Sequence, residues 1–362
     1  MPNAPTGRFV AALCTAAALA AVAACSETPG TANSASDDGT GIGGGATEYP
    51  LTIENCGSEV TFEAPPEKVV IMNGASVGEV ESLLTLGLED AILANVQSYG
   101  MSEDPAMVER IAALPDGGLT VNENFDVPAE QMLALEPDLV ISTAASGFDP
   151  AYGFAPRDEL AAVGANTLIH PANCALGAAD ATAEQREALE NATVEDSFAF
   201  LRLLGKVFDV QDEAEAVVTG LSARIDAVES AVEGVERPTA LIVYPGMSMM
   251  NANGLPAVMS GGIFDDVLHR AGTVNSFAGD TELTASLSQE QLAAADVDLL
   301  VVGGFTPGED LDAAAQALFD AYPDWAASQT GNYVTVSDGV YLGPLNALAI
   351  EKIAQRAHPD RF

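Results

Sequence analysis

Few residues in this chain could carry covalent or metal chemistry: it holds four cysteines and three histidines. Cys14 and Cys25 lie in or directly after an apolar stretch near the N-terminus, which leaves Cys56 and Cys174 as the remaining pair. In an exported protein two such cysteines usually pair, so we expect a disulfide between them. A two-cysteine metal site is the alternative, but only His170 is close in sequence and no CxxC or HxxxH pattern accompanies it.

Most signatures of common catalytic sites are missing from the sequence. GASVG at 74–78 matches GxSxG, but there is no HExxH, no SxxK around any lysine and no P-loop around Lys206. These absences favour a binding function without a catalytic or cofactor site. An enzyme and a structural surface lipoprotein are kept as alternative hypotheses.

The first 24 residues are typical of an export signal. Arg8 is the only charge before the apolar run 9–24, which ends in small residues directly before Cys25. This junction is similar to a bacterial lipobox, in which the cysteine is acylated and becomes the mature N-terminus. A simple secretory signal cut near Ala24 is the alternative. Residues 25–49 are rich in Gly, Ser, Thr and Asp and predict a flexible tether between a membrane anchor and a globular body.

The charge balance limits the possible partners. The chain has 53 Asp and Glu against 13 Lys and Arg, a formal net charge of −40. Such a surface repels nucleic acid and anionic lipid headgroups, so we expect neither as a partner. With 48% hydrophobic residues the chain can build substantial cores, and its length suits two domains. We expect a monomer.

The pattern of elements predicts two α/β lobes joined by helices. Short apolar strands alternate with helices over residues 50–192 and again over 237–362, which indicates parallel sheets covered on both faces. Residues 193–236 contain no strand candidate and show helical spacing in two long segments, broken near 209–212. We therefore predict an N-terminal lobe, a long helical bridge and a C-terminal lobe.

One helix-to-strand unit occurs twice. AEQMLALEPDLVIS at 129–142 and QEQLAAADVDLLVV at 289–302 share a glutamate, Glu130 and Glu290, and an aspartate, Asp138 and Asp298, in the same register. A repeat of this kind is expected if the two lobes have like structures.

The order of motifs resembles the bacterial substrate-binding proteins of importers for iron–siderophores, haem and cobalamin. Residues 64–94 are similar to the family's opening strand, loop and Glu-x5-Gly helix, with Glu81 and Gly87 in register. FDVPAEQMLALEPDLVIS is similar to its Leu-x-Pro-Asp signature, and 261–278 to the second lobe's helix ending in Ala-Gly-x-x-Asn. Val297 departs from the usual proline. The resemblance implies two Rossmann-like lobes joined by a helical bridge, the class III architecture.

The resemblance also implies partners. Glu130 and Glu290 correspond to the family's glutamates that engage arginines on a dimeric ABC permease with its cytoplasmic ATPase. Solvated glutamates favoured by the helix dipole are the alternative. The implied ligand is a small metal chelate in the cleft between the lobes, outside the carboxyl ends of the strands. Candidate contact residues follow the predicted strand ends: Asn73, Ser76, Tyr99, Arg157, Tyr244, Met247, Met249, Asn251 and Phe305.

Among ligands, a ferric siderophore is the first expectation, and haem, cobalamin or another cofactor-like molecule is the alternative. Haem-binding members of the family combine His and Tyr, so His170 with Tyr244 is a possible axial pair. Local hydrogen bonding of a strand-end histidine is the competing interpretation. The scarcity of basic residues argues against strongly anionic cargo, which would need several arginines.

Overall fold

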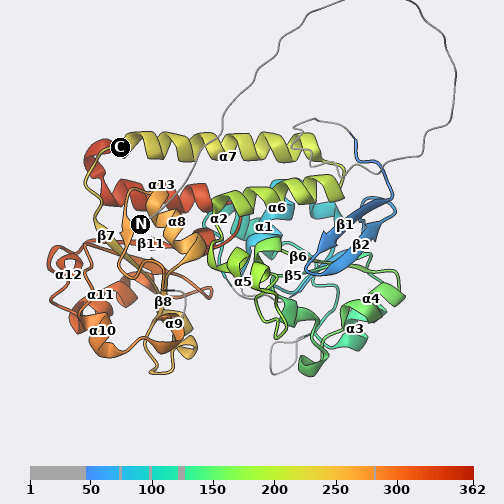
Figure 1. The fold of residues 1–362 in the computed structure, drawn as a ribbon, viewed down its shortest axis with the longest axis horizontal. Helices are drawn as coiled ribbons and strands as arrows, with labels where there is room; N and C mark the ends of the chain where they lie inside the picture. Colours follow the sequence, from blue (N-terminus) through green and yellow to red (C-terminus); the bar gives the residue numbers. More distant parts are fainter. Residues whose placement is uncertain (1–45, 73–75, 98–99, 121–126, 281–282) are drawn as a thin grey trace, which may run out of the picture. The chain divides into compact units, whose positions relative to one another are not determined.

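The computed structural model describes residues 46–72, 76–97, 100–120, 127–280 and 283–362. Every element described below lies in one compact unit, residues 44–362 (Figure 1). The predicted signal segment, the lipidation site Cys25, and the ligand candidates Asn73 and Tyr99 lie outside the described residues. Within the described ranges, no helix has both the length and the apolar character needed to cross a bilayer.

The first lobe is built on a parallel four-stranded sheet with the order β4-β3-β5-β6. Its strands are β3 Val69–Ile71, β4 Ile92–Asn95, β5 Leu139–Ser142 and β6 Asn166–Ile169. All residues of β3 and β5 are buried, as expected for strands with helices on both faces. The helices of this lobe are α1 Gly78–Thr85, α2 Pro105–Ala112, α3 Ala129–Ala134, α4 Arg157–Ala162 and α5 Ala183–Glu190.

The second lobe holds a mixed sheet with the order β11-β10-β7-β8, in which β9 also pairs with β7. β7 Thr239–Tyr244, β10 Leu299–Gly303 and β11 Tyr333–Val336 are parallel, as predicted, whereas β8 Ala257–Met259 is antiparallel. The sequence analysis missed β8 and β9 Val274–Asn275 because, unlike β3, neither lies in a continuous apolar run of four or more residues. The main helices are α8 Gly262–Arg270, α9 Leu283–Ser286, α10 Gln289–Ala293, α11 Leu311–Ala321, α12 Ala326–Thr330 and α13 Asn346–Ala357.

The aspartate of the repeated unit has the same structural task in both lobes. Asp138, before β5, accepts hydrogen bonds from the backbone N–H groups of Glu67 and Lys68 at 2.8 and 2.9 Å, directly before β3. Asp298, before β10, accepts from the backbone N–H of Thr239 at 2.9 Å, where β7 begins. Each aspartate thus fixes the start of the neighbouring strand, so the aspartates of the repeat have a structural role.

The helical bridge consists of α6 Val194–Val207 and α7 Gln211–Ala231, which run side by side (Figure 1). The chain reverses between them at Asp209, whose φ is +59°. Gly205 allows the close approach, since a Cβ there would lie 2.6 Å from that of Ala214. α13 of the second lobe packs against α7 as well. The break and the two helices were predicted from spacing alone.

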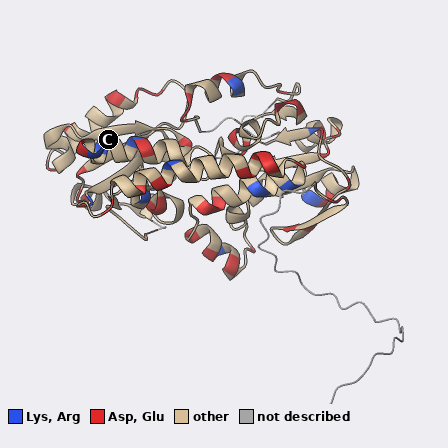
Figure 2. Ribbon diagram, turned by 90° about the horizontal axis from the view of Figure 1, so that it is seen from above, with Lys and Arg blue, Asp and Glu red and all other residues tan. Residues whose placement is uncertain are grey.

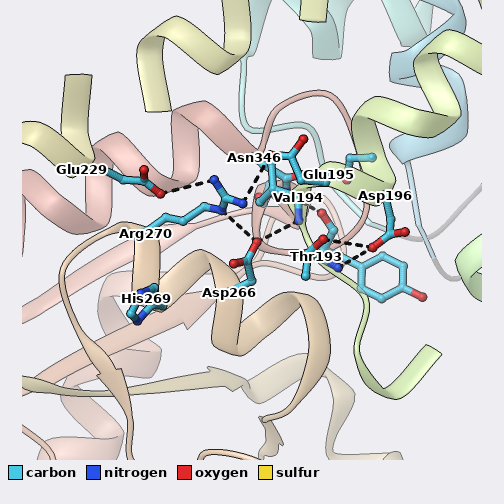
Figure 3. Close-up of polar contacts among 12 residues, drawn as sticks. Thr193, Val194, Glu195, Asp196, Glu229, Asp266, His269, Arg270 and Asn346 are labelled. Atoms are coloured by element: carbon cyan, nitrogen blue, oxygen red, sulfur yellow. Dashed lines mark hydrogen bonds and ion pairs between the residues drawn. The ribbon is translucent and has the colours of Figure 1, made fainter. Parts of the chain in front are cut away.

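Arg270 ties the bridge to the second lobe. Its side chain, on α8, is 18% exposed and reaches Asp266 on the same helix at 2.9 Å, Glu229 on α7 at 3.3 Å and Glu195 on α6 at 3.4 Å (Figure 3). Asp266 also accepts a hydrogen bond from the first backbone N–H of α6, that of Val194, at 2.9 Å. One guanidinium therefore contacts three helices. Elsewhere acidic side chains far outnumber basic ones over the described elements (Figure 2).

A disulfide joins Cys56 and Cys174, as predicted. Cys56 and Gly57, both with positive φ, form the turn of the hairpin β1 Leu51–Asn55 and β2 Ser58–Phe62. Positive φ at both central residues is the conformation that a tight hairpin turn requires. Cys174 follows β6, so the bond fastens the hairpin to the edge of the first sheet.

Replacing both Cys56 and Cys174 by serine is expected to lower the free energy of unfolding by about 2–5 kcal/mol, because the bond closes a loop across 118 positions of sequence. Denaturant unfolding under non-reducing conditions measures the loss. Cys25→Ser is the matched control and should leave the unfolding midpoint unchanged. Equal midpoints for the double variant and the control would contradict the expectation.

Candidate ligand-binding site

A cavity of about 730 Å³ lies between residues of the two lobes. The first lobe contributes Leu176, which follows β6, and Leu189 and Glu190 at the end of α5. The second lobe contributes the residues after β7, β10 and β11 and the start of α8. The cavity is therefore bordered by the carboxyl ends of parallel strands, where open α/β sheets bind ligands. Its volume suits a ligand of drug or cofactor size.

The cavity walls are mainly apolar. Seven of the twenty lining residues are methionines or aromatic residues from several elements of the second lobe: Tyr244, Met247, Met250, Met259, Phe264, Phe305 and Tyr341. Thioether side chains are unbranched and polarizable, so they adapt to irregular apolar ligands. Of the residues that the sequence analysis took from predicted strand ends, Tyr244, Met247 and Phe305 lie on this lining. Met249 is 75% exposed and is not part of the lining.

Arg157 does not reach this lining, contrary to the sequence expectation of a cleft cation. Its Nε donates to the hydroxyl of Thr167 at 2.7 Å, and its terminal nitrogens donate to the carbonyl and side-chain oxygens of Asn55 at 2.9 and 3.1 Å. The guanidinium also lies 5.8 Å from the ring centroid of Phe148. It therefore joins the hairpin to β6, and burial lowers its pKa.

Ser76 and Asn251 are also absent from the lining, because both are buried and engaged in local structure. The hydroxyl oxygen of Ser76 accepts from the backbone N–H of Gly78 at 3.0 Å, at the start of α1. The Asn251 amide donates to the carbonyl oxygens of Thr284 and Leu287 at 3.0 and 3.2 Å. Both side chains shape loops near the cavity and leave its surface to other residues.

His170 and Tyr244 do not come together in the cavity. His170 is buried, packs 4.5 Å from the ring of Phe200, and its Nδ1 accepts from the backbone N–H of Ala172. Burial lowers its pKa to about 3. Tyr244 lines the cavity and donates its phenolic hydroxyl to the carbonyl oxygen of Ser337 at 3.1 Å. The axial haem pair proposed from the sequence is therefore not assembled.

Next to the cavity, the two lobes are joined by backbone hydrogen bonds. The N–H of Gly100 donates to the carbonyl oxygen of Phe305, and the N–H of Asp338 donates to that of Met101, both at 3.0 Å. The Ser337 N–H donates to the carboxylate of Glu103 at 2.5 Å. We call this contact of residues 100–103 with 305 and 337–338 the interlobe seam. Gly100 is required there, because it has φ +76° and a Cβ would lie 2.3 Å from an Asp338 carboxylate oxygen.

Four acidic residues lie in or beside the interlobe seam. Glu103 and Asp338 belong to it, and Glu79 and Glu81 of α1 lie next to it. Glu103 forms an ion pair with Lys352 of α13. Burial, reinforced by repulsion among the carboxylates, raises the pKa of Glu79 and Asp338 to about 7 and that of Glu81 further above its usual range. The sequence analysis named none of Glu79, Glu103 or Asp338, although Asp338 is the second residue after β11 and a search of the residues after each strand would have included it.

Glu130 and Glu290 occupy the second position of α3 and α10, respectively, and both are exposed. The neighbouring glutamines have local tasks: Gln131 accepts from the Thr120 N–H, and Gln291 completes a capping box with Ser288. Within the described ranges, neither glutamate carboxylate accepts a hydrogen bond. The structure thus gives the aspartates of the repeat a structural role and leaves its glutamates available to a partner.

The fold is that of a two-lobed binding protein of the class III architecture, with a cavity between the lobes. The chain belongs to the periplasmic binding protein family, whose model matches residues 69–334. A comparison with curated proteins finds no match.

Solved structures with the same fold include three informative examples. The ABC-type Fe3+-hydroxamate transport system from Saccharomonospora viridis is 25% identical, with a TM-score of 0.63 over 85% of this chain and 99% of that one. A periplasmic binding protein from Veillonella parvula is 19% identical, with a TM-score of 0.66 over 85% and 97% of the two chains. The periplasmic heme-binding protein RhuT from Roseiflexus is 18% identical, with a TM-score of 0.57 over 82% and 99%.

The raised pKa values of the acids at the interlobe seam predict a pH-dependent stability. A carboxyl with a pKa of about 7 when folded and about 4.5 when unfolded stabilises the fold fully below pH 4.5. That contribution is lost as the pH rises through 7. Glu79→Gln is therefore expected to raise the free energy of unfolding at pH 8 by on the order of 2 kcal/mol. At pH 4.5 the substitution should leave the free energy of unfolding nearly unchanged.

Urea unfolding of both proteins at the two pH values measures this effect. The exposed Glu130→Gln is the matched control and should follow the unsubstituted chain at both. A Glu79→Gln protein less stable than the parent at pH 8, with parallel pH profiles, would show that the Glu79 carboxyl is ionised and satisfied in the fold.

Proposed function

We propose that this chain is the extracytoplasmic binding protein of an ABC importer and captures a ferric siderophore in the cavity between its lobes. The observation that carries the proposal is the cavity itself: about 730 Å³, walled by methionines and aromatic rings and bordered by both lobes. Siderophore complexes present a largely organic surface around the iron, which suits an adaptable apolar wall. The fold's likeness to an Fe3+-hydroxamate transport component supports the same ligand class.

Haem, cobalamin and other cofactor-like molecules are the competing ligands for the same role. Haem propionates are anionic and call for basic partners, whereas the described lining has no Lys, Arg or His. His170 lies outside that lining, and the Tyr244 hydroxyl is already bonded to the backbone. For these reasons we propose a ferric siderophore ahead of haem and cobalamin.

In the proposed cycle the protein is held at the outer face of the membrane by a lipid on Cys25, with residues 26–48 as tether. It then binds the chelate and presents it to the permease dimer, which the cytoplasmic ATPase drives. The family is one of binding proteins, and catalysis has no part in the proposal. Glu130 and Glu290, one on each lobe, are the proposed docking contacts to arginines of the two permease subunits.

The ligand proposal is tested by isothermal titration of the purified chain with ferric trihydroxamates, iron-free trihydroxamates, ferric catecholates, haem and cobalamin. We expect one ferric trihydroxamate per chain with a Kd of about 1 μM or below, and much weaker binding of the iron-free form. Heat is the preferred readout because the single tryptophan, Trp325, is stacked on Tyr322 and does not line the cavity. Binding of haem or cobalamin alone would replace the proposed ligand.

The docking proposal is tested with the double variant Glu130→Ala, Glu290→Ala. We expect uptake of the iron chelate by cells to fall by tenfold or more, because two charge-assisted contacts are lost, while the Kd of the purified protein for the chelate is unchanged. Glu136→Ala with Asp296→Ala, both exposed and both at the eighth position of the same repeated units, is the matched control. Normal uptake with the double variant would rule out docking through these glutamates.

A further inference from the structure

The lining of the cavity carries acidic groups and no basic one. Its carboxyl groups are Asp338 from the second lobe and Glu190 from the first, and the described lining contains no Lys, Arg or His. The internal segments outside the described ranges, 73–75, 98–99, 121–126 and 281–282, contain no Lys, Arg or His in their sequence either. A ligand in this cavity therefore meets negative charge with no positive charge to balance it.

Three basic side chains elsewhere in the fold are held by other partners. Lys352 pairs with Glu103 of the interlobe seam, and Arg270 contacts Asp266, Glu195 and Glu229 (Figure 3). Arg224 binds Glu351 with two hydrogen bonds, at 2.6 and 2.8 Å. Moving any of these side chains into the cavity would leave a carboxylate without its partner, which is costly where that carboxylate is buried.

Asp338 is held in place from several sides. It begins the short helical turn after β11, its backbone N–H is bonded to Met101, and one of its carboxylate oxygens lies 3.4 Å from the Val77 N–H. It lines the cavity together with Tyr244 and Tyr341. Glu190 is exposed at the end of α5 and borders the same cavity from the other lobe. Asp338 and Glu190 thus line the same cavity. Asp338 is held by hydrogen bonds, and Glu190 is exposed to solvent.

We infer that Asp338, assisted by Glu190, makes this cavity select iron chelates that carry a positive charge, such as a protonated amine appended to an uncharged coordination shell. The inference rests on the proposed function and specifies its ligand class. The apolar wall suits the neutral shell of a ferric trihydroxamate, and the ammonium pairs with the Asp338 carboxylate. Anionic chelates, such as ferric tris-catecholates, would be repelled by the two carboxylates, and no cation of the described lining would balance that repulsion.

If an ammonium group pairs with Asp338, the affinity for the ligand must depend on pH. The groups that face Asp338 are the α1 carboxyl groups of Glu79 and Glu81, Glu103 with its partner Lys352, and the phenols of Tyr244 and Tyr341. In their presence, and mainly because of burial, the Asp338 pKa is about 7. A bound ammonium favours the ionised carboxylate, so binding releases a proton. The affinity for a cationic chelate must then rise with pH up to about 7 and level off above it.

The experiment compares two chelates that differ in one group. Ferrioxamine B is a linear ferric trihydroxamate with a terminal ammonium, and its N-acetylated derivative has the same shell without the charge. Titration calorimetry at pH 8 is expected to give a Kd about 10- to 100-fold lower for the ammonium form, the usual value of a hydrogen bond to a charged group. Between pH 5.5 and 8 the affinity for ferrioxamine B should rise while that for the acetylated form stays flat.

Variants then assign the effect to residues. Asp338→Asn keeps an oxygen that can accept from Val77 and should reduce the preference for the ammonium form to less than threefold. Glu190→Gln should reduce it by a smaller factor, and Glu184→Gln, exposed on the same helix outside the cavity lining, should leave it unchanged. Because the ligand pair alone tests the preference on the unsubstituted chain, a variant that fails to fold does not block the test.

The outcomes separate this inference from the proposed function. Equal Kd values for the two ferrioxamines at pH 8, or tighter binding of a ferric tris-catecholate, would overturn the charge selection and leave siderophore capture standing. Binding of no ferric chelate would overturn both. A clear ammonium preference that persists in Asp338→Asn and in Glu190→Gln would overturn the assignment to these residues.

Discussion

The arrangement of the two lobes depends on the interlobe seam, where a few residues of each lobe exchange backbone hydrogen bonds beside the ligand cavity. The bonds from Gly100 to Phe305 and from Asp338 to Met101 bring the two lobes into direct contact. With these bonds in place, Asp338 lies on the cavity lining, and the carboxyl groups of Glu79 and Glu103 lie near its own. Burying several acids at one contact costs free energy, and the raised pKa values of Glu79 and Asp338 record that cost. A ligand with a positive group would offset part of it.

The bridge and the interlobe seam constrain the lobes in different ways. α6 and α7 pack closely through Gly205 and Ala214, and Arg270 fastens both helices to α8. The bridge therefore connects the lobes through packed helices, with α13 of the second lobe also packed on α7. The interlobe seam is smaller and more polar, and burial raises the pKa of its Asp338 to about 7. Where the lobes shift on ligand binding, we expect the change to occur at this contact.

Much of the architecture could be predicted from the sequence because its signals are local and repeated. The buried strands and the two bridge helices have clear periodicities, and the repeated unit at 129–142 and 289–302 indicated two like lobes. The structure then divided that repeat into two parts. Asp138 and Asp298 fix the starts of β3 and β7, whereas Glu130 and Glu290 remain exposed for a partner.

The site was harder to predict, because strand ends give candidates but not the direction of a side chain. Tyr244, Met247 and Phe305 follow strands and line the cavity, whereas Arg157 is turned to Asn55 and Thr167 by hydrogen bonds across 102 and 10 positions of sequence. The acids at the interlobe seam come from separate elements, α1, the segment before α2 and the turn after β11. Only the three-dimensional structure brings them together.

The central claim, that the interlobe cavity holds a ferric chelate, is tested most directly by a crystal structure of the chain with a ferric trihydroxamate, using anomalous scattering at the iron absorption edge. The account predicts one strong iron peak inside the cavity, within reach of Tyr244, Met247 and Phe305 and with both lobes in contact with the ligand. An empty cavity with iron bound at the surface, or density for the chelate on one lobe only, would contradict it.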